Sequence, residues 1–275
     1  MTVLFEQSQV IVQLDVERRT AYVELRPEGA PNFNLQLLES LKDWVFIAQS
    51  SKIRETFDYV VYQSATPAVF NLGGDLEYFA SCVDQEDWAA LDHYAKLCVD
   101  LVYANYNGYI RDDLITNTFP PLTTIADVQG LCLGGGFEMA LSCNYIVASS
   151  EASFGFPEIR FGLFPGMGAL QLLQMHMPLE ATKRFILSGE VRTFQDDLPF
   201  AIKAGHTLEV EALLQRIRQK AAAYRFVQGY GRKELDIQDL YYVAKKWVQV
   251  AKTITSDQID FMRAISERQR RKYSA

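Results

Sequence analysis

The sequence predicts an α/β protein, and three observations support this fold class. Strand-like and helix-like segments alternate through the first two thirds of the 275 residues. Apolar residues in the helix-like segments recur every three or four positions. From about residue 208 onward only helical patterns remain. With 49% hydrophobic residues the chain can bury a large core, and we expect a mixed core over residues 1–188 and a helical region over 189–275.

Each element of the predicted core has its own local signal. Two apolar runs flank the charged turn ERRT, which is typical of a β-hairpin. A Pro-Pro pair precedes the last strand-like run and separates it from the helix before it. In chain order we expect a hairpin over 10–27, a helix over 35–49, a buried strand over 59–65, an amphipathic helix over 88–105 and a strand over 120–130. Three more helices are expected over 209–226, 237–254 and 256–272.

Composition and charge exclude several classes of protein. No apolar run approaches the roughly 20 residues of a membrane span. The N-terminus lacks a cationic segment followed by apolar residues, so we expect no signal peptide and a cytoplasmic location. The net charge of -7 disfavours a nucleic-acid partner. The basic segment ERQRRK, residues 267–272, is expected to be a solvated helix end.

The cysteines and histidines do not form a metal-binding pattern. The three histidines are scattered and no CxxC pair is present. We therefore expect no metal and no cofactor. The four cysteines are expected to be reduced packing residues: Cys82, Cys98, Cys132 and Cys143.

The stretch GLCLGGGFEMALSC, residues 130–143, places three glycines directly before a helical apolar run. Such glycines let a backbone approach a ligand closely, with the free N–H groups of a helix N-terminus turned toward it. The P-loop pattern and the GxSxG elbow are both missing, so nucleotide binding and serine hydrolysis are not indicated. Glu138 falls in the first helical turn, where it serves either the helix dipole or acid/base chemistry beside an oxyanion donor.

Two further stretches favour the acid/base interpretation. VFNLGGDLEYF, residues 69–79, places a second glycine pair between a strand and a helix, and so supplies a second set of backbone amides. FGFPEIRFG contains Glu158, twenty positions beyond Glu138, in apolar surroundings where an unpaired carboxylate is costly.

These motifs together resemble the crotonase (enoyl-CoA hydratase/isomerase) superfamily. FNLGGDL, QGLCLGGGFEMALSCNYIVAS, FGFPEI and GLFPGMGA occur in its order and at its spacing. The resemblance implies a spiral of ββα units, a C-terminal helical region that forms trimers or hexamers, and an oxyanion hole for an acyl thioester. By position, the amides of Gly74 and Gly135 correspond to that hole, and Glu138 and Glu158 correspond to the acid/base pair.

Within the superfamily the chain looks most like the diffusible-signal-factor synthases, which make unsaturated fatty acid signals for bacterial quorum sensing. NFNLQLLESL, VFNLGGDLEYF, ILSGEVRT and DFMRAISERQRRK carry this likeness. It implies dehydration of a 3-hydroxyacyl thioester of acyl carrier protein or coenzyme A, followed by thioester hydrolysis. The segment after LSGEVRT departs from the family, which puts acyl length and the thioesterase step in question.

In the implied reaction Glu158 takes the Cα proton of the thioester and Glu138 protonates the departing 3-hydroxyl, while the two amides stabilise the enolate. Apolar residues near the site are expected to line an acyl channel, with ordinary core packing as the alternative. They are Phe154, Phe156, Phe161, Phe164, Met167 and Leu170.

Two other functions remain open from the sequence. One is an enoyl-CoA hydratase or isomerase without thioesterase activity, which would leave the thioester intact. The other is a non-catalytic acyl-binding or regulatory protein, although such a protein has no need for two desolvated carboxyls.

Overall fold

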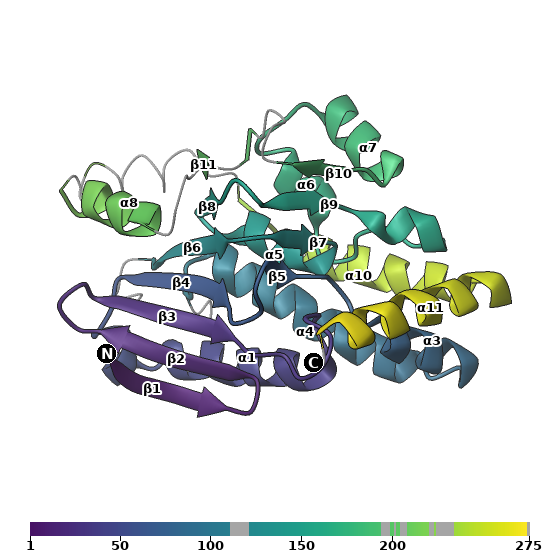
Figure 1. The fold of residues 1–275 in the computed structure, drawn as a ribbon, viewed down its shortest axis with the longest axis horizontal. Helices are drawn as coiled ribbons and strands as arrows, with labels where there is room; N and C mark the ends of the chain where they lie inside the picture. The colour runs from purple at the N-terminus through teal and green to yellow at the C-terminus, as the bar shows by residue number, and fades with distance from the viewer. Residues whose placement is uncertain are drawn as a thin grey trace.

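The computed structural model describes residues 1–110, 121–193, 199–200, 202–203, 208–219, 223 and 234–273. Within these residues two β-sheets are flanked by helices (Figure 1). The larger sheet has the strand order β1 (Thr2–Gln7), β2 (Val10–Asp15), β3 (Thr20–Leu25), β4 (Tyr59–Ser64), β6 (Thr123–Val128), β8 (Tyr145–Ala148) and β11 (Ile202–Lys203). The smaller sheet has the order β10 (Val191–Thr193), β9 (Ser153–Gly155), β7 (Leu131–Leu133) and β5 (Val69–Asn71).

A repeating ββα unit builds the two sheets together. Each repeat adds one strand to the larger sheet and the next strand to the smaller one, and all of these strands pair in parallel with those of the neighbouring repeat. Helices follow each strand pair. They are α3 (Leu76–Asp84) and α4 (Trp88–Tyr106), then α5 (Gly135–Ser142), then the 3-10 helix η1 (Pro157–Phe161) and α6 (Ala169–Leu173). The predicted α/β spiral is therefore confirmed.

The N-terminal segment forms the predicted hairpin. β2 and β3 pair antiparallel from Val10 opposite Leu25 to Asp15 opposite Thr20, around the charged turn. β1 adds a further antiparallel strand that the sequence analysis did not predict. Helix α1 (Leu35–Ala48) follows, and the side chain of Asn34 caps it by accepting a hydrogen bond from the N–H of Leu37 at 2.9 Å. The short helix α2 (Ser51–Arg54) then leads to β4.

The alternation of side chains along β4 gives the larger sheet two buried faces. Val60 and Tyr62 belong to the main core, whereas Tyr59 and Val61 belong to a second apolar cluster. Helix α8 (Leu208–Gln219) covers this second cluster with Leu213 and other residues. A sheet buried on both faces explains why YVVY is apolar throughout.

The C-terminal helices lie on the side of the molecule where α3 and α4 lie (Figure 1). α10 (Ile237–Ala251) packs against α4, and α11 (Ser256–Tyr273) packs against α3 and η1. Both helices agree with the sequence prediction, as does α8, although residues 220–222 and 224–226 of its predicted span lie outside the described residues. Helix α7 (Leu179–Ser188) precedes β10, and both β10 and β11 join the sheets beyond residue 188, where the sequence analysis places the domain boundary.

In the described part of the chain, no helix has the length and apolar character needed to cross a membrane. Most of the segment at 194–212 that departs from the synthase pattern lies outside the described residues.

Candidate active site

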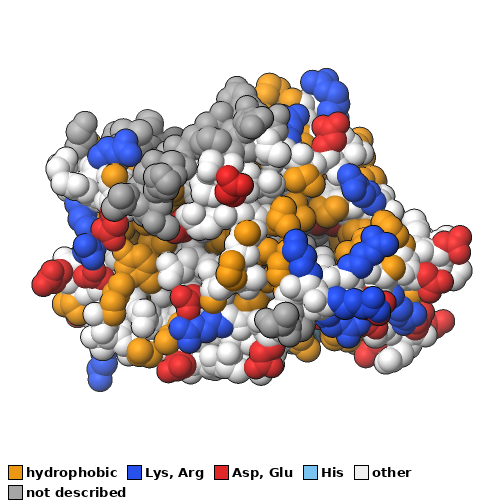
Figure 2. All heavy atoms as spheres, in the orientation of Figure 1, with side chains coloured by type: hydrophobic (Ala, Val, Ile, Leu, Met, Phe, Trp, Pro, Cys, Tyr) orange, Lys and Arg blue, Asp and Glu red, His pale blue; other side chains and the backbone are white. Residues whose placement is uncertain are grey.

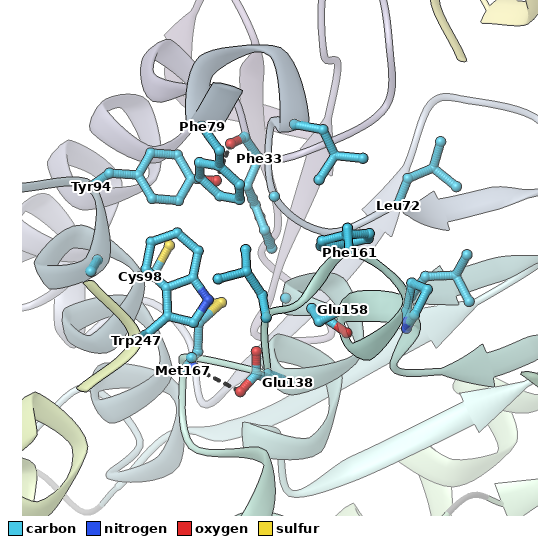
Figure 3. A pocket seen from close by; sticks show the side chains of 18 of the residues that line it. Phe33, Leu72, Phe79, Tyr94, Cys98, Glu138, Glu158, Phe161, Met167 and Trp247 are labelled. Carbon is cyan, nitrogen blue, oxygen red and sulfur yellow. Dashed lines mark hydrogen bonds between the residues drawn. The ribbon is translucent and has the colours of Figure 1, made fainter. Parts of the chain in front are cut away.

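A cavity of about 190 Å³ lies between the glycine loops, α3, α4 and the C-terminal helices. A single water needs only about 10–15 Å³ by the same measure, so the cavity has room for a substrate group. Its wall is mostly apolar, and Glu138 and Glu158 both line it (Figure 3). Gly74 and Gly135 line it as well.

The first glycine loop is shaped by the side chain of Asn71. Its Oδ1 accepts a hydrogen bond from the N–H of Gly73 at 2.8 Å, which is the Asx turn expected where Asn precedes a tight turn. Gly73 has φ of +95°, a conformation that favours glycine. The N–H of Phe33 donates to the carbonyl of Gly73 at 2.8 Å, and Asp75 caps α3 immediately after the loop. The position of Gly74 is therefore fixed from both sides.

The second glycine loop, residues 134–136, contacts the first, residues 73–74, without side chains between them. Helix α5 begins at Gly135, as the sequence predicts. A Cβ on Gly136 would lie 2.7 Å from the Cβ of Asn71, and one on Gly73 would lie 3.2 Å from the nitrogen of Gly135. Within the described residues, the N–H groups of Gly74 and Gly135 have no hydrogen-bond acceptor. Two unpartnered donors thus border one cavity.

The Glu138 side chain is bound by a distant loop. Its Oε1 accepts hydrogen bonds from the N–H groups of Met167 at 2.7 Å and Ala169 at 2.9 Å. The residue is 1% exposed, and burial raises the pKa of its carboxyl to about 7 against the opposing effect of these hydrogen bonds. A glutamate that served only the dipole of its own helix would not need hydrogen bonds from another loop.

The Glu158 carboxyl lies against the second glycine loop. A Cβ on Gly134 would come within 2.4 Å of its Oε1, so a side chain at this position would displace the carboxyl. Its Oε2 is buried and has no partner among the described residues, although part of the residue is accessible. Burial, and then the charge of Glu138, raise the pKa of Glu158 to about 8.

The predicted acyl-binding residues divide into two groups. Phe161 and Met167 line the cavity. Phe156 does not, because it packs on Phe137 at 4.8 Å between ring centroids, within an aromatic cluster of the core. Phe154 belongs to the same cluster. Phe164 and Leu170 are also absent from the lining, and Leu170 is 39% exposed. Phe154, Phe156 and Phe164 thus follow the packing alternative, whereas Leu170 belongs neither to the cavity wall nor to the core.

Several lining residues were missed by the sequence analysis. Trp247 comes from α10, and Ile265 and Gln269 come from α11. The helical periodicity of these segments predicts that each helix has a buried face, but no local pattern indicates which element that face contacts. Asn71 could have been found from the Asn that precedes a glycine pair at the end of a strand.

Within the described residues, no three His, Cys, Asp or Glu side chains gather as metal ligands. The four cysteines are buried and free, as predicted. Cys98 lines the cavity, and burial raises the pKa of its thiol well above the ordinary value.

Comparison with known proteins identifies the family. Residues 26–223 match the family model described as enoyl-CoA hydratase/isomerase. The chain belongs to this family. Mitochondrial methylglutaconyl-CoA hydratase of Rattus norvegicus is 29% identical over 222 residues, which is 81% of this chain and 60% of that protein. A probable enoyl-CoA hydratase of Rhizobium meliloti is 34% identical over 44% of this chain and 43% of its own length.

Solved structures of the hydratase family show the same fold. Enoyl-CoA hydratase from Bacillus halodurans superposes with a TM-score of 0.75 at 20% identity, over 94% of this chain and all of that one. An enoyl-CoA hydratase/isomerase from Xanthobacter autotrophicus Py2 gives a TM-score of 0.70 at 21% identity, over 97% of this chain and 96% of the other. The predicted crotonase superfamily is thus confirmed, while the chain spans about 60% of the length of the rat hydratase.

Proposed function

We propose that this enzyme removes water from a 3-hydroxyacyl thioester to give the 2-enoyl thioester, and that the reverse hydration uses the same groups. The observation that carries the proposal is the pair of carboxyls with raised pKa, Glu138 and Glu158, that line one cavity. The amides of Gly74 and Gly135, which have no acceptor among the described residues, line it too. Functional sites are where such shifted acid/base pairs gather.

The amides of Gly74 and Gly135 stabilise the negative charge that develops on the thioester oxygen, each by about 3 kcal/mol. Glu158 accepts the Cα proton, and the electron pair of that C–H bond moves into the enolate. As the enolate collapses, the C3–O bond breaks and Glu138 donates a proton to the departing hydroxyl, which leaves as water. A proton moved from Glu158 to Glu138 then restores the starting state.

The pKa values of the pair suit this exchange. One carboxyl must be ionised and the other protonated, and with pKa values of about 7 and about 8 the pair holds one proton near neutral pH. The lower pKa of Glu138 places this proton mainly on Glu158, which is the state that starts the hydration. Dehydration starts from the state in which the proton has moved to Glu138. The rate is expected to fall on both sides of this range, because the pair is fully protonated below it and fully ionised above it.

We further propose that the same site hydrolyses the enoyl thioester, as in the diffusible-signal-factor synthases. A glutamate would take a proton from a water that attacks the thioester carbonyl, the same amides would hold the oxyanion, and the thiol would leave with a proton. The synthase-like segment DFMRAISERQRRK lies in α11, which contributes to the cavity wall, and this supports the proposal. Acyl carrier protein and coenzyme A are both candidate carriers of the substrate.

The family match supports a hydratase or isomerase without hydrolysis equally well. The products separate the two, because hydrolysis releases a free unsaturated acid whereas a hydratase retains the thioester. A non-catalytic acyl-binding protein would retain binding and turn over neither substrate.

The test is incubation of the purified protein with 3-hydroxyacyl thioesters of both carriers, with the products identified by mass spectrometry. Glu138→Gln and Glu158→Gln should each lower the dehydration rate by about 10²- to 10⁴-fold, since each loses one acid/base group. Glu180→Gln, at a side chain that is 72% exposed, is the matched control and should keep wild-type rates. Wild-type rates in both active-site variants would contradict the proposal.

A further inference from the structure

Tyr94 of α4 is buried beside the first glycine loop, and no step of the proposed reaction uses it. It is 4% exposed and lies next to Phe79 in the cavity wall (Figure 3). Its ring is edge-on to Phe79 at 5.0 Å between centroids and stacked on Tyr78 at 5.6 Å. Because a buried hydroxyl needs a hydrogen-bond partner, the partner of the Tyr94 phenol indicates what this side chain holds in place.

The phenol of Tyr94 bonds to the segment that is paired with Gly74. It donates a hydrogen bond to the carbonyl oxygen of Phe33 at 2.5 Å. Phe33 pairs with Gly74 in an isolated parallel β-bridge, and its N–H donates to the carbonyl of Gly73 at 2.8 Å. A Cβ on Gly74 would lie 3.6 Å from the phenol oxygen, so the phenol also lies next to Gly74 itself.

The residue after Gly74 lies close to the same oxygen. Burial raises the pKa of the Tyr94 phenol well above its ordinary value, and the nearby N–H of Asp75 partly offsets this increase. The phenol is therefore in contact with the partner of Gly74 in the β-bridge and with its neighbour in the chain. Since glycine restricts its own backbone less than any other residue, the direction of the Gly74 N–H depends on such contacts.

We propose that Tyr94 is a positioning residue that orients the Gly74 amide toward the thioester oxygen. This inference rests on the proposed function, in which that amide stabilises the enolate. A donor that acts on a developing charge has to keep its direction, and a displacement of about 1 Å can cost about 10²-fold in rate. The Tyr94 hydroxyl acts through the backbone, so its loss should lower kcat more than it raises KM.

The first test removes only the hydroxyl. Tyr94→Phe keeps the ring that packs on Phe79 and Tyr78. It should lower kcat for dehydration about tenfold, while KM stays within about twofold of wild type, because the lost effect is on the transition state. An unchanged kcat would contradict the inference.

A second readout does not depend on turnover. The ligand is the ketone analogue of decanoyl pantetheine, in which CH₂ replaces the thioester sulfur, so that it can be neither dehydrated nor hydrolysed. Its carbonyl is isotope-labelled, and infrared difference spectra of the bound ligand report the hydrogen bonds to the carbonyl oxygen. The stretching frequency should fall when the ligand binds to the wild-type protein. It should fall less in Tyr94→Phe, because the Gly74 amide is then misaligned.

Tyr62→Phe is the matched control. Tyr62 is also fully buried and its phenol donates to Asn105 at 2.7 Å, but it does not line the cavity. This variant should lose stability in thermal scans and keep the wild-type kcat and the wild-type fall in carbonyl frequency.

The outcomes separate the inference from the proposed function. An equal fall in frequency in the wild-type protein and in Tyr94→Phe would overturn the inference and leave the proposed function intact. No fall in the wild-type protein would overturn both, because the Gly74 amide would then not bond to the carbonyl. Absence of product from every 3-hydroxyacyl thioester, with the frequency difference present, would overturn the proposed reaction alone.

Discussion

The two acidic residues of the cavity are held in different ways. Glu138 has two backbone donors on one oxygen, whereas Glu158 has a buried oxygen with no partner among the described residues. Hydrogen bonds to a carboxylate favour its charged form, so Glu138 is the more easily ionised of the two. Burial raises the pKa of both residues above the ordinary value of 4.5, so each favours its neutral form more than an exposed glutamate does.

Stability should therefore depend on pH through Glu158. The pKa of about 8 in the folded protein exceeds the ordinary value of 4.5, so the folded state binds this proton more tightly than the unfolded state. The resulting stabilisation is complete below pH 4.5 and is lost as pH rises through about 8. Relative to wild type, Glu158→Gln should have a melting temperature that increases steadily from pH 5 to pH 8.5. A constant difference across that range in thermal scans would contradict the assignment.

Gly134 should tolerate no side chain. Its φ is +52°, and an added Cβ would displace the Glu158 carboxyl, so Gly134→Ala should lower activity by about 10²-fold. Gly189→Ala is the matched control, because Gly189 also has positive φ, +62°, but an added Cβ there would meet Ile159 and Arg160 and not Glu158. Both variants should lose about 1 kcal/mol of stability or more. Equal activity in the two variants would show that the contact with Glu158 is unimportant.

At the scale of elements, α11 forms part of the cavity wall and part of the exposed surface. Its inward face completes the cavity, while its last turns carry exposed cations; Figure 2 shows Lys and Arg side chains gathered on this side of the molecule. Arg270 is paired with Glu77, and Arg271 with Glu267. Within the described residues Arg268 and Lys272, one turn apart, have no ion-pair partner.

If acyl carrier protein carries the proposed substrate, we expect Arg268 and Lys272 to attract its acidic surface. The double variant Arg268→Glu/Lys272→Glu should raise KM for a 3-hydroxyacyl carrier protein about tenfold at low salt, and the effect should shrink at high salt because screening weakens the attraction. The kcat for a small pantetheine thioester should stay unchanged. Lys96→Glu/Lys183→Glu, at cations paired with Asp92 and Glu180, is the control. An equal rise in KM for the small substrate would contradict a role in docking.

Sequence patterns located most elements because each carries its own periodicity. The helices over 35–49, 88–105 and 237–254 end within a few residues of α1, α4 and α10. β1 was missed, since only one of its six residues is buried and the strand therefore shows no clear apolar alternation. Phe156 was assigned to the acyl channel because local sequence cannot tell which side of β9 the following loop faces.

At the scale of the whole molecule, the spiral and the glycine motifs could be predicted because they follow one another along the chain. The share of the cavity formed by α10 and α11 could not be predicted, since it depends on packing between segments far apart in the sequence, such as Gly166 and Trp247. Asp100 and Tyr241, which bond α4 to α10 across a separation of 141 residues, show the same dependence.

The family resemblance implies a trimer or a hexamer, and one surface fits this expectation. Leu187 is 64% exposed, Val191 is 42% exposed, and the nearby Ile159 is 38% exposed. Light scattering should give three or six times the 31.3 kDa of one chain. Leu187→Asp should lower this mass, whereas Val16→Asp, at a residue that is 64% exposed in the hairpin turn, should not. A single-chain mass for the wild-type protein would contradict the expectation.

The contribution of α11 to the cavity wall has a consequence for biosynthesis. The glycine loops and both acids can be assembled on the ribosome well before α11 is translated, but the substrate compartment then stays open to solvent. A nascent polypeptide that ends before Ser256 would thus carry its acids in an open compartment, and catalytic competence would arrive only once α11 has been translated.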